Sequence, residues 1–87
     1  MKNYYSTIDE VVMTFTDIEK NYQGFESITV HFERPSEKGF DFSEWRLPDI
    51  VQTKSFGFSE DEVLGQKDYL IRNQFLIWDI AKEGKIA

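Results

Sequence analysis

Residues 58–84 constrain the fold most, because both ends of this stretch carry the signals of a long helix. Ser59 and Glu62 form the S-x-x-E pattern of a capping box, in which the serine oxygen accepts a backbone N–H and the glutamate reaches back. Acidic residues fill the first turn, and Lys82 and Lys85 lie near the other end, as the helix dipole favours. We therefore predict one long C-terminal helix that needs a surface to pack on.

Apolar residues cover most of the circumference of this predicted helix. The polar face is narrow and consists of Asp68, Arg72, Asp79 and Glu83. Apolar side chains form two flanks, one with Leu64, Ile71, Phe75 and Trp78 and the other with Tyr69, Leu76 and Ile80. A thin sheet beneath the helix covers both flanks only with help from another element, so we expect one flank to meet a partner.

Residues 4–22 predict a first helix, because their apolar side chains recur at i, i+3, i+4 and i+7. Gly24 is the expected end of this helix. Many β-branched residues in the segment lower its helix propensity, but strict alternation is absent, so the helical period decides the assignment.

The middle of the chain reads as strands. Residues 25–34 alternate between apolar and polar side chains, which predicts a strand with one buried face. Residues 40–47 predict a second strand, and a one-residue slip in its pattern suggests a bulge near Ser43 or Glu44. Residues 50–56 are the expected third strand.

These elements predict a single α+β domain over residues 1–87 with the order α-β-β-(β)-α. We expect two helices packed on one face of a small antiparallel sheet of two or three strands.

The amino-acid composition limits which cellular compartment and which kinds of partner we expect. The 87 residues contain no cysteine and carry a formal net charge of −6. We predict a cytoplasmic protein without a membrane span, because the sequence lacks disulfide candidates, a signal peptide and a long apolar run. The acidic charge makes nucleic acid an unlikely partner and favours a basic one.

Catalytic and metal-binding patterns are weak. His31 is the only histidine, and no nucleophile, base and orienting residue can be assigned together, so we predict no enzyme. His31, Glu33 and Asp41 could converge with Trp45 on an open sheet face and bind a small ligand or a metal, which is our alternative hypothesis. The spacing matches no strong metal motif, so we expect neither a metal nor a cofactor.

One string resembles a known family. Residues 38–45, Lys-Gly-Phe-Asp-Phe-Ser-Glu-Trp, look like the RNP1 segment of the RNA-recognition motif, whose aromatic residues stack on bases. Asp41 and Ser43 depart from that pattern, and the chain has no matching N-terminal RNP2 strand. RNA binding is therefore the third hypothesis.

Aromatic residues are abundant for so small a chain, with eight Phe, four Tyr and two Trp. A domain of this size buries only part of its surface, so some of them should lie outside and form an interface. The expected interface residues are Trp45, Leu47, Tyr69, Leu76 and Trp78. Our leading hypothesis is a small, acidic, non-enzymatic interaction module of the bacterial accessory type, an inhibitor, immunity protein or regulator that binds a protein partner or itself.

Overall fold

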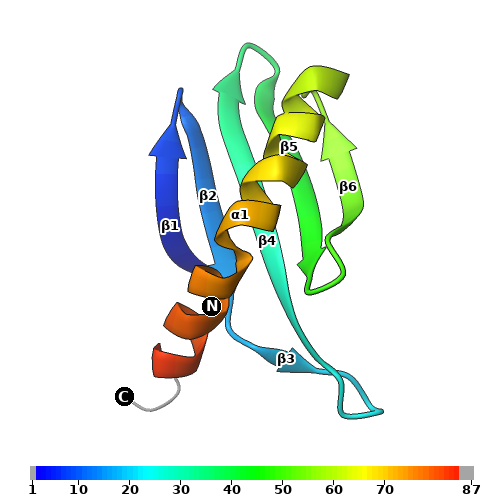
Figure 1. The fold of residues 1–87 in the computed structure, drawn as a ribbon. Helices are drawn as coiled ribbons and strands as arrows, with labels where there is room; N and C mark the ends of the chain where they lie inside the picture. The colour runs from blue at the N-terminus through cyan, green and yellow to red at the C-terminus, as the bar shows by residue number, and fades with distance from the viewer. Residues whose placement is uncertain (1, 85–87) are drawn as a thin grey trace.

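The computed structural model describes residues 2–84, which form six strands followed by one helix (Figure 1). In chain order these are β1 Lys2–Ile8, β2 Val11–Thr16, β3 Glu19–Lys20, β4 Glu26–Ser36, β5 Gly39–Leu47, β6 Val51–Phe56 and α1 Glu60–Gly84. Met1 and residues 85–87, including the Lys85 expected beyond the helix end, lie outside the described residues.

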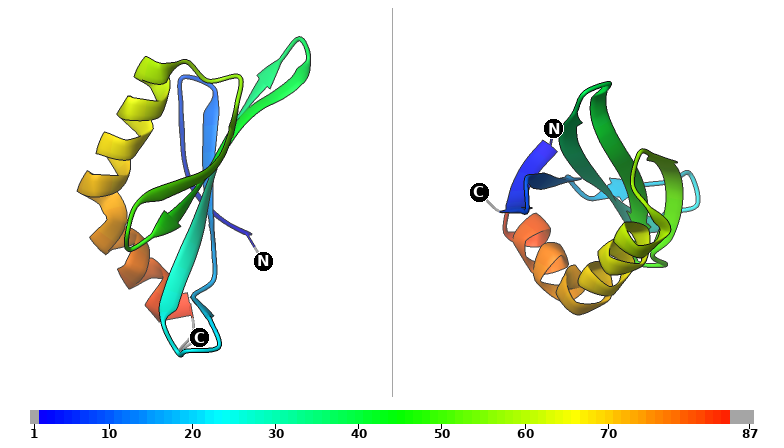
Figure 2. Two further views of the ribbon diagram at one scale, coloured as in Figure 1. Left: turned by 90° about the vertical axis from the view of Figure 1, so that its right-hand side faces the viewer. Right: turned by 90° about the horizontal axis from the view of Figure 1, so that it is seen from above.

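The strands form an antiparallel sheet in the order β1-β2-β4-β5-β6, and the short β3 pairs with the beginning of β4. α1 crosses one face of this sheet diagonally, from the β5–β6 side at its first turn to the β1 side at its last (Figure 1). Within residues 2–84 no helix covers the other face (Figure 2).

The predicted architecture of two helices on two or three strands is wrong, because residues 4–22 form strands instead of a helix. Asp9 and Glu10 have φ of 50° and 68° and make the two-residue turn of a hairpin in which Ile8 pairs with Val11. A right-handed helix cannot pass through such a turn. Ile8 and Val11 are paired across the turn and are three residues apart in the sequence. This spacing interrupts the alternation of the two strands and resembles the i, i+3 spacing of a helix. Gly24 does have a positive φ of 85°, but in the loop before β4 and not at a helix end.

The other predicted elements are present. β4, β5 and β6 correspond to the three expected strands, and α1 begins at the expected capping box. The backbone N–H of Glu62 donates to Ser59 Oγ at 3.2 Å, and the backbone N–H of Ser59 donates to Glu62 Oε1 at 2.9 Å.

The expected slip in the second strand is not found in its burial pattern. Residues 41, 43, 45 and 47 all lie on the buried or half-buried side of β5. The irregularity belongs to the pairing with β6, where Glu44 pairs with Lys54 and Trp45 with Gln52, so that Thr53 is the extra residue.

The core lies between α1 and the sheet. It consists of Met13, Phe15, Ile28, Val30, Phe32, Trp45 and Leu47 from the strands and Leu70, Ile77 and Ala81 from the helix. Alternate residues of β2 and β4 contribute to it because successive side chains of a strand point to opposite faces.

A bulge fastens the edge strand β1 to the helix. The pairing of β1 with β2 shifts between Tyr4 and Ser6, so Tyr5 is an extra residue. Tyr5 Oη donates to Asn73 Oδ1 at 2.7 Å, and Tyr69 Oη donates to Ser6 Oγ at 3.1 Å. Two consecutive residues of β1 therefore reach α1, which a regular strand would not allow.

One helix is too narrow for this sheet. Five strands side by side span roughly 19 Å, whereas a helix with its side chains is about 10–12 Å wide. The diagonal crossing therefore leaves space beside the first half of α1, above the β1–β2 hairpin, and leaves both flanks of the helix partly exposed.

Candidate functional site

Two of the expected interface residues lie in the core. Trp45 is 3% exposed and Leu47 is fully buried. Trp45 Nε1 donates to Gln66 Oε1 at 3.2 Å and to Ser43 Oγ at 3.3 Å. These side chains support the packing of α1 and offer no surface to a partner.

The other three expected interface residues lie on different sides of α1. Tyr69 is half-buried, and its ring packs edge-on against Tyr5 with centroids 6.3 Å apart. Leu76 is 53% exposed on the same flank. Trp78 is half-buried on the opposite flank, where it packs against the core.

The flank that contains Trp78 is the longest exposed apolar line of the helix, and we call it the outer flank. Leu64, Ile71 and Phe75 expose 63%, 50% and 75% of their surface there. Exposed Glu60 and Lys82 lie on the same line at its two ends. Residues 4–22 form strands and not the predicted helix, so no element within residues 2–84 covers this line.

The proposed sheet-face residues do not converge. His31 and Glu33 lie on the face away from α1, because their neighbours Val30 and Phe32 point into the core. Asp41 lies on the helix side and pairs with Arg34. Glu33 pairs with Lys2 at 3.3 Å. Within residues 2–84 no three histidine or acidic side chains form a group that could hold a metal ion.

His31 has a different neighbour on the open sheet face. Its Nε2 lies 3.2 Å from Glu44 Oε1, while its Nδ1 is buried without a hydrogen-bond partner among the described residues. The Thr53 hydroxyl donates to Glu44 Oε2 at 2.7 Å. This hydrogen bond, together with the charges of Lys54 and His31, lowers the pKa of the Glu44 carboxyl.

The aromatic residues of the RNP1-like string lie on the open sheet face. Phe40 and Phe42 are exposed there, and the Phe42 ring stacks on Phe56 with centroids 6.0 Å apart. The nearby cation Arg46 is already paired with Asp49, with Nη2 and Oδ2 2.7 Å apart. Lys38, the basic residue of the string, is exposed beside them, and RNA binding stays a prediction that these contacts do not test.

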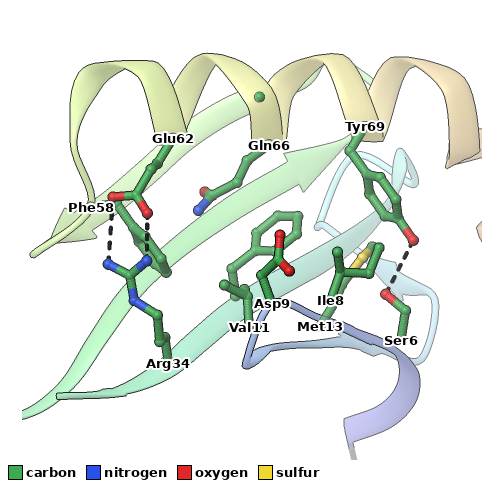
Figure 3. A pocket seen from close by; sticks show the side chains of 12 residues that line it. Ser6, Ile8, Asp9, Val11, Met13, Arg34, Phe58, Glu62, Gln66 and Tyr69 are labelled. Atoms are coloured by element: carbon green, nitrogen blue, oxygen red, sulfur yellow. Dashed lines mark hydrogen bonds and ion pairs between the residues drawn. The ribbon is translucent and has the colours of Figure 1, made fainter.

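The space beside the first half of α1 is a pocket of about 320 Å³ (Figure 3). It lies between the β1–β2 hairpin and α1, and β4 contributes to its wall. Its lining residues are mostly apolar and comprise Ser6, Ile8, Asp9, Val11, Met13, Phe32, Arg34, Phe58, Glu62, Gly65, Gln66 and Tyr69.

An ion cluster closes one end of the pocket. Arg34 Nη2 lies 2.8 Å from Asp41 Oδ2, and Arg34 Nη1 pairs with Glu62 Oε2. The guanidinium carbon lies 4.8 Å from the centroid of the Phe58 ring, a cation–π distance. Hydrogen bonds from Arg34 and then from the Ser59 backbone lower the pKa of Glu62 to about 2, and both acids raise the pKa of Arg34.

Two helix residues on the pocket wall were missed by the sequence reasoning. Gln66 is buried and accepts hydrogen bonds from Ser43 and Trp45. Gly65 lies inside the helix, where glycine costs about 1 kcal/mol relative to alanine. A Cβ at this position would meet nothing within 4 Å, so close packing does not require the glycine. A glycine in the middle of a predicted helix, with no evident reason for it, was the one sequence signal that could have pointed to this wall of the pocket.

Comparison with protein-family models, curated proteins and solved structures gave no match to this chain. Among the described residues, no helix has both the length and the apolar character needed to cross a membrane.

Proposed function

We propose that this chain is a non-enzymatic protein-interaction module whose outer flank binds a second copy of the chain. One observation carries the proposal: Leu64, Ile71 and Phe75 are large, apolar, at least half exposed and aligned along one side of α1. Aligned apolar side chains form a continuous patch, and such patches mark interaction sites more often than scattered ones do.

The order of residues along the outer flank favours a second copy over an unrelated partner. In an antiparallel pair of identical helices, positions equally far from the two-fold axis face each other. With the axis at Ile71, Glu60 of one copy faces Lys82 of the other, and Leu64 faces Trp78. The flank therefore brings apolar side chains together near the axis and opposite charges at its ends, and the exposed Lys67 of one copy faces Phe75 of the other.

The alternative occupant is a basic protein, which the net charge of −6 would attract. An inhibitor, immunity or regulatory role remains a prediction from size and acidity. The cytoplasm is the proposed location, because the chain has no cysteine that an oxidising compartment could pair.

Sedimentation across a hundredfold concentration range tests the proposal. Ile71→Asp places two carboxylates opposite each other at the axis, so we expect it to abolish the dimer. Leu76→Asp is the matched control, because Leu76 is exposed to the same degree as Ile71, 53% against 50%, but lies on the other flank. A parent that stays monomeric throughout, or two variants that weaken the dimer equally, would contradict the pairing.

A charge exchange tests the register of the pair. Glu60→Lys alone puts two lysines opposite each other at each end and should weaken association. Adding Lys82→Glu restores the opposite charges in the reversed order, so the double variant should recover the affinity of the parent. If the double variant is as weak as the single one, the helices pair in another register.

A further inference from the structure

We propose that the pocket between the β1–β2 hairpin and the first half of α1 binds a small organic cation, an ammonium group on a compact apolar body. This site is independent of the proposed dimer, because it opens beside Tyr69 and not along the outer flank. Ser6 and Asp9 from the hairpin and Gly65 and Tyr69 from α1 line it together, and Ser6, Asp9 and Tyr69 can be followed in Figure 3.

The size and walls of the pocket suit a small molecule with an apolar body. Its volume of about 320 Å³ lies at the lower end of the range for small-molecule sites. Ile8, Val11, Met13 and Phe32 form a mainly apolar floor, and Phe58 and Tyr69 add aromatic rings. Aromatic walls attract ammonium groups as well as apolar bodies.

The charges around the pocket select a cation. Arg34 is the only positive side chain in the lining, and it is already engaged by Asp41 and Glu62. The Asp9 carboxylate points from the hairpin turn toward α1, and it has no hydrogen-bond or ion-pair partner within residues 2–84. An anion would have to displace a carboxylate from Arg34, whereas an ammonium group finds Asp9 unpaired.

Gly65 keeps the helix side of the pocket open. A Cβ built on it would enter empty space, with no atom within 4 Å. Because Gly65 lines the pocket, we expect a larger side chain at this position to narrow the opening without a clash at its Cβ. Almost any other residue would favour the helix more than glycine does. What glycine provides at this position is open space beside the pocket.

Three probes with one body and different head groups test the charge selection: 2-phenylethylammonium, 2-phenylethanol and 3-phenylpropionate. Titrations followed by amide chemical shifts give the three affinities, and shifts at Ser6, Asp9 and Gly65 locate the binding. We expect the ammonium to bind about fivefold more tightly than the alcohol, the order of one solvent-screened charge pair, and the carboxylate to bind most weakly. Equal binding of the three probes, or no binding of the ammonium at millimolar concentration, would overturn the proposal.

Variants test the two residues that carry the argument. Asp9→Asn should remove most of the preference for the ammonium over the alcohol, whereas Glu10→Gln, in the same turn but outside the lining, should keep it within about twofold. Gly65→Leu should weaken all binding at least about tenfold by filling the space, with its helical circular dichroism unchanged. If Gly65→Leu unfolds the chain, the comparison of Asp9→Asn with Glu10→Gln decides alone. A preference for the ammonium that survives Asp9→Asn would refute the site.

Discussion

Replacing Glu62 by glutamine tests the ion pair that joins β4 to the first turn of α1. Glutamine can still cap the backbone N–H of Ser59, because Glu and Gln both complete a capping box. The substitution therefore removes the charge that faces Arg34 and retains the cap. Asp61→Asn is the matched control, since it removes one charge from the same helical turn without touching Arg34.

The size of the effect follows from the lowered pKa of Glu62. A pKa that falls from 4.5 to about 2 would correspond to about 3 kcal/mol if the pair were shielded from solvent. The side chain of Glu62 is 38% exposed, so solvent screening reduces this figure. We expect Glu62→Gln to lower the free energy of unfolding by about 1–1.5 kcal/mol at pH 7, and Asp61→Asn by less than about 0.5 kcal/mol.

The pH dependence gives a second, independent readout. Because the folded pKa of Glu62 lies below its unfolded value, its stabilisation is present above about pH 4.5 and is lost as the pH falls toward 2. The difference between parent and Glu62→Gln should therefore shrink to less than half by pH 3 in urea unfolding experiments. Equal losses for Glu62→Gln and Asp61→Asn at pH 7, or a difference that stays constant down to pH 3, would refute this reasoning.

Two further substitutions probe other parts of the fold by the same urea experiments. Gln66→Leu should cost about 2–3 kcal/mol, because the buried donors of Ser43 and Trp45 lose their acceptor, and adding Ser43→Ala should recover part of that loss. Without any recovery, the hydrogen bond between Ser43 and Gln66 is not the source of the cost. Glu10→Gly should stabilise the chain by about 0.5–1 kcal/mol, since glycine adopts the φ of 68° without strain. A loss of stability would exclude the left-handed turn conformation.

Local signals in the sequence determined the helix and three of the strands. Ser59 and Glu62 are close in the chain and satisfy each other, so the start of α1 needs no distant residue. The alternation along β4 likewise shows which side chains are buried, because a strand inside a sheet has two distinct faces. The two exposed flanks of α1 also follow from its own periodicity.

Only the tertiary structure decided the state of residues 4–22 and the composition of the pocket. A turn at Asp9 and Glu10 has neither the glycine nor the asparagine that usually marks such a hairpin, so the pairing of β1 with β2 and of β2 with β4 fixed it. The pocket joins Asp9, Arg34 and Gly65 from three distant elements, and no local pattern connects them. Long-range pairing and the limited width of a single helix brought these residues together, and neither leaves a periodic signal in the chain.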